Sequence, residues 1–242
     1  MDQKSLMDIT QEYPRLLDTP GMIAQDFGIL YPHAKDKLFE LWGHASQRIL
    51  SYCKTEKRAL DLLPLQTNIS SDTLGDVALK TLPAILPPLP YKIGSKMVRP
   101  SYQEAKEAFV DLQPVSTFMT THFGYYLIYV CIFTISKFYS KVGTNIIQYL
   151  EEEEQRRQFP HVLQLGDKVN CSQAFVIVGG VALEQDSLLQ AVDTCFKLFY
   201  VLDIEYPKPA AAVWQFLQHT IYSVPGGVPS THCRLLRQFI IG

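Results

Sequence analysis

The chain has 242 residues, of which 47% are hydrophobic and 19% are charged, so a packed core is expected and a wholly disordered chain is excluded. The 22 basic and 24 acidic residues leave a net charge of −2, which excludes the overall positive field of a general nucleic-acid binder. Its five cysteines lie far apart without a Cys-x-x-Cys pair, which argues against a disulfide framework or structural zinc site and favours reduced thiols in an intracellular protein.

Residues 1–64 are expected to form a helical region. A turn at residues 18–21, Asp-Thr-Pro-Gly, precedes a short helix over residues 22–27. The clearest helix covers residues 31–53, because its apolar side chains recur at the spacing of one helix face. The first apolar residues of the chain are interrupted by charged ones, so no signal peptide is expected. The side chains on the apolar face of residues 31–53 are Leu38, Leu41, Trp42, Ala45 and Ile49.

Residues 65–100 are interpreted as a proline-rich linker. Prolines interrupt the apolar pattern repeatedly, and only residues 74–82 keep the periodicity of a helix. The remainder, residues 86–100, is expected to be extended. The prolines are Pro83, Pro87, Pro88, Pro90 and Pro100.

Residues 101–157 are expected to form a helical segment that contains an apolar insertion. Its first helix, residues 101–112, begins at Ser101 and has Glu104 three residues later, which is the pattern of a capping box. An uncharged apolar stretch follows, and charged side chains return in a second helix over residues 149–157.

Residues 158–224 are expected to form a β-β-α-α module. Short apolar runs predict the strands, and the uninterrupted run at residues 174–178 indicates a strand buried on both faces. The order of elements predicts an α+β fold, in which a small antiparallel sheet of two or three strands packs against two C-terminal helices. Residues 225–242 are interpreted as a tail. The expected strands are residues 162–165, 174–178 and 181–183, and the expected helices are residues 187–200 and 209–222.

Three blocks of sequence carry a family resemblance. They comprise residues 13–21 and 25–27 with Trp42; residues 163–167 and 174–178; and residues 193–202, Tyr206-Pro207 and residues 214–217. Together these blocks resemble the C-terminal half of the sterile alpha motif domain-containing protein 3-like family of fish and invertebrates. The resemblance implies no established enzymatic activity, so no catalytic residues are carried over. Family members often have an N-terminal sterile alpha motif domain, a protein-interaction module, which this chain is expected to lack.

One segment departs from that family pattern. In the family, a stretch like residues 107–114 runs almost directly into one like residues 143–146, whereas here about 27 residues intervene, residues 115–141. Three interpretations remain open. The insertion is a retained intron translated in frame, since its ends are compatible with splice-site sequences; or it is a transmembrane helix over residues 118–135, although its most apolar part is shorter than the roughly 20 residues that span a bilayer; or it is a buried core helix.

No catalytic, cofactor-binding or metal-binding residues are expected. Asp203 and Glu205 lie two residues apart after a helix, and a strand there would place both carboxylates on one face, as a metal site or an acid–base pair requires. A solvated turn is the favoured interpretation. The fold could bring His161 and His219 together, but satisfied or surface histidines are favoured.

The favoured function is a non-enzymatic, intracellular protein-interaction module with an unidentified protein partner and no strong nucleic-acid signal. One alternative is a single-pass membrane protein anchored by residues 118–135. A second alternative is a metal- or nucleotide-dependent enzyme that uses Asp203 and Glu205.

Overall fold

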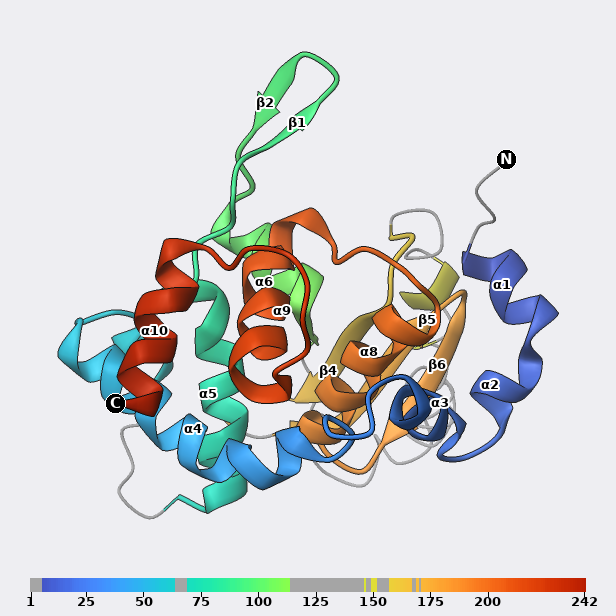
Figure 1. Cartoon of the computed structure of the whole chain (residues 1–242), viewed down its shortest axis with the longest axis horizontal. Helices are drawn as coiled ribbons and strands as arrows, with labels where there is room; N and C mark the ends of the chain where they lie inside the picture. The colour runs from blue at the N-terminus through green and yellow to red at the C-terminus, as the bar shows by residue number, and fades with distance from the viewer. Residues whose placement is uncertain are drawn as a thin grey trace, which may run out of the picture.

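The chain folds into helices packed around a four-stranded sheet, with a separate two-stranded hairpin (Figure 1). The computed structural model describes residues 6–63, 69–113, 146, 149–151, 157–166, 169 and 171–242. The helices are α1 (Leu6–Glu12), α2 (Pro14–Asp18), α3 (Met22–Leu30), α4 (Lys37–Thr55), α5 (Ser71–Ile85), α6 (Tyr102–Phe109), α8 (Leu188–Val201), α9 (Ala211–Phe216) and α10 (Thr231–Ile241), with short helical turns η1 (Leu60–Leu62) and η2 (Lys208–Ala210) and a π-helical segment η3 (Leu217–Tyr222). The strands are β1 (Tyr91–Ile93), β2 (Lys96–Val98), β3 (Val110–Gln113), β4 (His161–Gly166), β5 (Cys171–Val178) and β6 (Val181–Gln185).

The main sheet has the order β3-β4-β5-β6, and the mixture of helices and sheet confirms the α+β expectation in outline. Three of its strands are the expected antiparallel ones, but β3 adds a fourth that runs parallel to β4. The expectation of a purely antiparallel sheet, with residues 101–112 all helical, is therefore wrong. The helix α6 ends at Phe109, and Val110 already has extended backbone angles, φ −132° and ψ 106°. The capping box at the start of α6 is confirmed, since Ser101 and Glu104 bond to each other's backbone N–H groups.

Helix α8 covers one face of the main sheet and supplies much of the core (Figure 1). All five apolar residues of β5, from Ala174 to Val178, are buried, which confirms the expected burial on both faces. On the face away from α8, Leu163, Phe175 and Ile177 form a smaller apolar cluster with partly buried side chains that include Tyr149.

Phe196 of α8 lies at the centre of an aromatic cluster. Its ring stacks on Tyr222 with the centroids 3.8 Å apart, and it also contacts Phe27, Tyr200 and Trp214. These partners come from α3, α8, α9 and η3, so one side chain joins the N-terminal helices to the C-terminal ones. The apolar stripe expected on this helix is confirmed in full, because each of its members is buried: Leu188, Val192, Cys195, Phe196 and Phe199.

A buried ion pair lies beside this aromatic cluster. Lys197 Nζ is 2.6 Å from Asp193 Oδ2, and the Tyr222 hydroxyl donates to Asp193 Oδ1 at 2.8 Å. Both charged side chains are about 2% exposed. Burial raises the pKa of Asp193, while Lys197 and Tyr222 oppose that rise. The charges are thus paired and hydrogen-bonded, as buried charges must be.

The helix α5 corrects the interpretation of residues 65–100 as a linker. The helix expected at residues 74–82 extends over the whole of α5, with Ser70 as its N-cap and most of its side chains buried. It packs against α4, where Trp42 Nε1 donates to the Gly75 carbonyl at 3.2 Å. A Cβ on Gly75 would lie 3.1 Å from the same nitrogen, so the glycine permits this close approach. On α4, the expected apolar face is confirmed except at Leu41, which is exposed.

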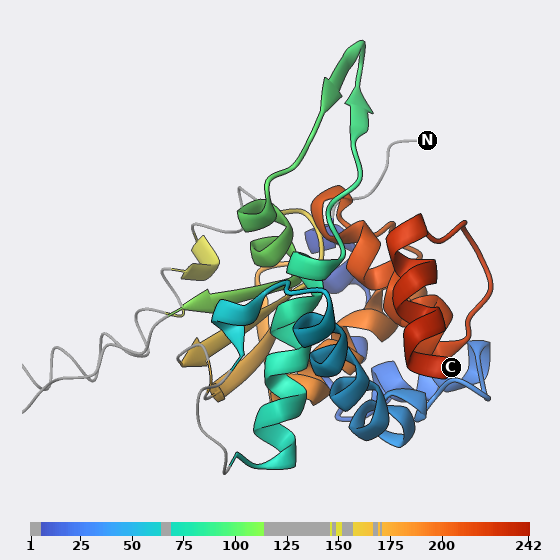
Figure 2. The ribbon, with the colours of Figure 1, turned by 90° about the vertical axis from the view of Figure 1, so that its left-hand side faces the viewer.

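The rest of the expected linker forms a hairpin that projects from the body (Figure 2). Strands β1 and β2 are antiparallel and joined by Gly94-Ser95, and Gly94 has φ 58°, as glycine-first hairpin turns require. We call β1, β2 and this turn the hairpin arm.

The expected tail, residues 225–242, contains helix α10, which packs on α4 and α9. The Arg48 guanidinium donates to the Phe239 carbonyl and lies over the Phe239 ring. Within the described residues, no helix is both long and apolar enough to cross a bilayer. The insertion at residues 115–141, including the anchor considered at residues 118–135, lies outside the described residues.

We expect Phe196→Ala to lower the free energy of unfolding by about 3–5 kcal/mol, because it removes the ring that joins α3, α8, α9 and η3. Chemical denaturation of the purified chain measures this. Leu235→Ala is the matched control, since Leu235 is half exposed on α10 and its loss should change the free energy by less than about 0.5 kcal/mol. Similar losses for the two variants would contradict the central role of Phe196.

Candidate functional site

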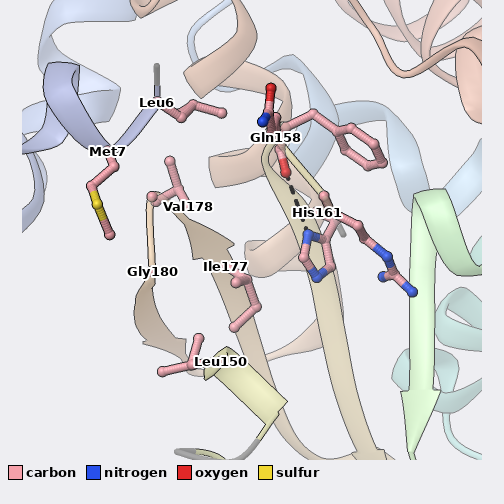
Figure 3. A pocket seen from close by; sticks show the side chains of 11 residues that line it. Leu6, Met7, Leu150, Gln158, His161, Ile177, Val178 and Gly180 are labelled. Carbon is pink, nitrogen blue, oxygen red and sulfur yellow. Dashed lines mark hydrogen bonds between the residues drawn. The ribbon is translucent and has the colours of Figure 1, made fainter. Parts of the chain in front are cut away.

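A small pocket opens at the end of the main sheet where β4 begins and β5 ends (Figure 3). Its volume is about 180 Å³, which suits a few water molecules and is smaller than typical ligand pockets. Helix α1 closes one side, and the approach is close, because a Cβ on Gly179 would lie 2.6 Å from Thr10 Oγ1. The lining is mostly apolar and comprises Leu6, Met7, Leu150, Arg157, Gln158, Phe159, His161, Ile177, Val178, Gly179 and Gly180.

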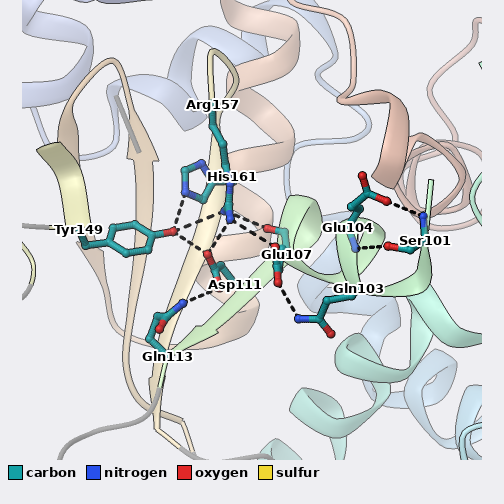
Figure 4. Close-up of polar contacts among 9 residues, drawn as sticks. All are labelled: Ser101, Gln103, Glu104, Glu107, Asp111, Gln113, Tyr149, Arg157 and His161. Carbon is teal, nitrogen blue, oxygen red and sulfur yellow. Dashed lines mark hydrogen bonds and ion pairs between the residues drawn. The ribbon is translucent and has the colours of Figure 1, made fainter. Parts of the chain in front are cut away.

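The polar wall of this pocket belongs to a buried group that we call the Asp111 cluster: Asp111, Tyr149, Arg157 and His161 (Figure 4). Asp111 lies on β3, and His161 is the first residue of β4. Strand alternation turns Asp111 to the side of the sheet opposite its apolar neighbour Val110, and the parallel register pairs it with Leu163. The cluster therefore spans the junction of the two parallel strands.

Asp111 is the hub of this cluster. Its Oδ2 accepts from Arg157 Nη2 and from the Tyr149 hydroxyl, each at 2.9 Å, while Oδ1 accepts from Gln113 at 3.0 Å. The side chains of Asp111 and Arg157 are only 5% and 9% exposed. Both carboxylate oxygens thus have a donor, and Oδ2 has a charged one, which offsets the cost of burying the carboxylate.

Arg157 also ties the cluster to helix α6. Its Nη1 donates to the Glu107 carbonyl at 3.1 Å, and its Nη2 lies 3.9 Å from the Glu107 carboxylate. The Glu107 carbonyl belongs to the last turn of α6, where carbonyl groups lack helical partners and cations are favoured. One guanidinium therefore joins α6, β3 and the start of β4.

His161 completes the cluster as a neutral base. Its Nε2 lies 3.0 Å from the Tyr149 hydroxyl and its Nδ1 lies 3.4 Å from the Phe159 carbonyl. Burial and, to a smaller extent, the nearby Arg157 charge lower the pKa of His161 to about 4, against the opposing effects of the Phe159 carbonyl and Asp111. A neutral imidazole carries one N–H, so His161 donates either from Nε2 to the Tyr149 hydroxyl or from Nδ1 to the Phe159 carbonyl, according to its tautomer. The imidazole is uncharged at neutral pH.

The chemistry that this arrangement supports is structural. Tyr149 hydrogen-bonds to Asp111 and to His161, and Arg157 bonds to Asp111, so the cluster holds the parallel strand pair together. Within the described residues, no three His, Cys, Asp or Glu side chains converge as metal ligands would.

The structure separates the residues that the sequence offered as candidates. Asp203 lies in a turn with φ 51°, and Glu205 pairs with Lys208 at 2.6 Å on the surface. Neither lies in a strand, so the shared carboxylate face is wrong. His161 and His219 do not bond to each other, because both His161 nitrogens face Tyr149 and Phe159, while Arg237 lies near His219.

Sequence reasoning missed three members of the Asp111 cluster. The sequence around Asp111, Val-Asp-Leu, places a single charged residue between two apolar ones. This pattern fits a buried strand, but it fits the end of a surface helix equally well. Tyr149 and Arg157 were placed on an exposed helix. Asp111, the partner that Tyr149 and Arg157 share, lies about 40 to 50 residues earlier in the chain. No local sequence pattern therefore indicates these contacts.

The comparisons with known proteins identify no related protein. No family model matches the chain, no curated protein matches it, and no solved structure matches it. The resemblance to the sterile alpha motif domain-containing protein 3-like family therefore stays a prediction.

We expect Asp111→Asn to lower the free energy of unfolding by about 3–5 kcal/mol, because it removes the close carboxylate partner of the buried Arg157 charge and leaves only the more distant Glu107 carboxylate. Denaturant unfolding measures the loss. Gln113→Ala is the control on the same strand, since it removes one neutral hydrogen bond and should cost about 1 kcal/mol. An equal loss of unfolding free energy in the two variants would show that the ion pair stabilises the fold no more than a single hydrogen bond does.

The pKa of His161 predicts a pH dependence of stability. As the pH falls below about 6.5, His161 binds a proton in the unfolded chain. In the folded chain it stays neutral until the pH approaches its pKa of about 4. The free energy of unfolding should therefore fall by about 3 kcal/mol from this group as the pH drops from 6.5 to 4. Asp76 opposes this change, since burial raises its pKa to about 6, so variants must be compared.

The measurement is denaturation at several pH values for His161→Gln and for His33→Gln, an exposed control. The loss of stability between pH 6.5 and 4 should shrink only in His161→Gln. An unchanged pH profile for that variant would refute a neutral, buried His161.

Proposed function

We propose that the chain is a non-enzymatic, intracellular protein-interaction domain, and that the hairpin arm is its binding element. The observation that carries the proposal is the exposure of the arm: Ile93 and Met97 are 61% and 59% exposed, although both are large apolar side chains. Two-stranded hairpins are marginally stable alone in water, so an arm held away from the core gains stability when a partner covers it.

The segments that connect the hairpin arm to the body support a binding role for the arm. Proline-containing segments flank it, with Pro87, Pro88 and Pro90 before β1 and Pro100 after β2. Prolines limit the backbone freedom of these stems, and each stem leads directly into a packed helix, α5 on one side and α6 on the other. A binding element that is fixed in this way loses less entropy when it docks.

The polar and aromatic groups of the interior contact one another, and this favours a functional role for the surface. The Asp111 cluster and the aromatic cluster around Phe196 bond within the fold, and the pocket beside His161 is small. The arm, in comparison, makes no side-chain hydrogen bond or ion pair with the described part of the body.

We expect a photo-crosslinking residue at Ser95, the tip of the arm, to give a discrete cross-linked protein product in cells that express the whole chain. The same residue at Val228, which is 82% exposed on the loop before α10, is the control and should give none. A chain in which residues 91–98 are replaced by a Gly-Ser linker should fail to compete for the product, whereas the unlabelled natural chain should compete.

The linker variant should keep its melting temperature, because the arm contributes nothing to the core. Equal cross-linking at both positions, or no product at either, would contradict the proposed role of the arm.

A further inference from the structure

We infer that the hairpin arm binds an acidic, extended segment of its protein partner, which adds as a third strand to an open edge of the arm. The inference rests on the proposed function and names the chemistry of the partner. It is carried by the charge of the arm, by the arrangement of its side chains and by its open backbone edges.

The arm is basic without any compensating acid. Lys92, Lys96 and Arg99 are exposed, and the sequence from residue 77 to residue 103 contains no Asp or Glu. In the described part of the chain, none of these three cations makes an ion pair or side-chain hydrogen bond. Elsewhere, surface lysines such as Lys37 and Lys208 have carboxylate partners within 2.6 Å. The arm is thus left complementary to an acidic ligand.

The register of the arm defines the pattern of that ligand. Lys92 pairs with Met97, and Ile93 pairs with Lys96, so each face presents one lysine directly opposite an apolar side chain. The two lysines lie on opposite faces of the ribbon. A strand added to the β1 edge would meet Lys92 between Tyr91 and Ile93, and one added to the β2 edge would meet Lys96 beside Met97. An acidic residue next to apolar or β-branched ones therefore fits best.

The backbone of the arm is free to accept such a strand. In a two-stranded antiparallel ribbon, alternate residues direct their N–H and C=O groups outward, and in the described structure no backbone bond from another element reaches residues 91–98. A third strand pairs these groups, and three strands are stable where two are marginal. Addition of a peptide strand to an open edge is an established mode of recognition.

Other occupants fit these features less well. A second copy of the arm would set lysines against lysines, which edge strands use to prevent self-pairing. A nucleic acid would be attracted by only three cations on a chain whose net charge is −2. A flat anionic bilayer would meet one face of the ribbon and leave the other lysine pointing away.

Fluorescence anisotropy of the full chain with a labelled ten-residue peptide, in which glutamates alternate with valine and threonine, tests the inference. The peptide should bind, and a version with N-methyl groups on alternate amides should bind at least about tenfold more weakly, because it keeps the charge but cannot pair as a strand. Lys92→Glu with Lys96→Glu should weaken binding by at least about tenfold. Lys54→Glu with Arg58→Glu is the matched control, since both side chains are exposed on the body and the change in charge is the same; it should stay within about twofold.

Two results would overturn the inference. One is equal binding of the natural and N-methylated peptides, which would mean attraction by charge alone. The other is binding of duplex DNA or phosphatidylserine vesicles in preference to the peptide, or no peptide binding up to about 1 mM. If Ser95 still cross-links a protein in cells, these results remove only the strand-addition chemistry and leave the proposed function standing. If cross-linking also fails, both fall.

Discussion

The ion pair between Asp111 and Arg157 is the constraint on which the arrangement of the two halves of the chain depends. It joins β3, which follows the N-terminal helices and α6, to β4, which starts the C-terminal part of the sheet. The same guanidinium holds the last turn of α6 through Glu107. Since α5 and α6 carry the hairpin arm between them, this buried contact links the base of the arm to the sheet. His161 is buried beside it, and the lowered pKa of this histidine makes the junction sensitive to acid.

The sequence predicted the elements whose signals are local. Helix α8 was predicted because its apolar residues recur at the helical spacing, and strand β5 was predicted because its apolar run is uninterrupted. The apolar residues of both elements are buried, as these two patterns require. The extent of α5 was missed because Pro83 looks like a helix breaker, although this proline lies near the end of the helix. Leu41 was assigned to the core on spacing alone, yet it lies at the border of the apolar face and is exposed.

The candidate site was beyond reach of the sequence for a different physical reason. Parallel pairing of β3 with β4 joins segments that are distant along the chain, and the donors to Asp111 come from the far side of that connection. At Asp203 the local backbone decided the outcome, because a left-handed turn replaced the strand that a shared carboxylate face needed. The hairpin had a readable signal in Lys-Ile-Gly-Ser-Lys-Met, a two-residue glycine turn between short apolar runs, but the surrounding prolines favoured the linker interpretation.

The parallel pairing of β3 and β4 also bears on how the gene product tolerates a change in length. A parallel pair needs a crossover of a dozen or more residues, and 47 residues lie between Gln113 and His161. Removing the 27 residues from 115 to 141 would leave 20, which still exceeds that minimum. The Asp111 cluster would keep all of its members, because each lies outside the removed stretch. A chain shortened by this segment would therefore still have enough residues between β3 and β4 to form the same parallel pair.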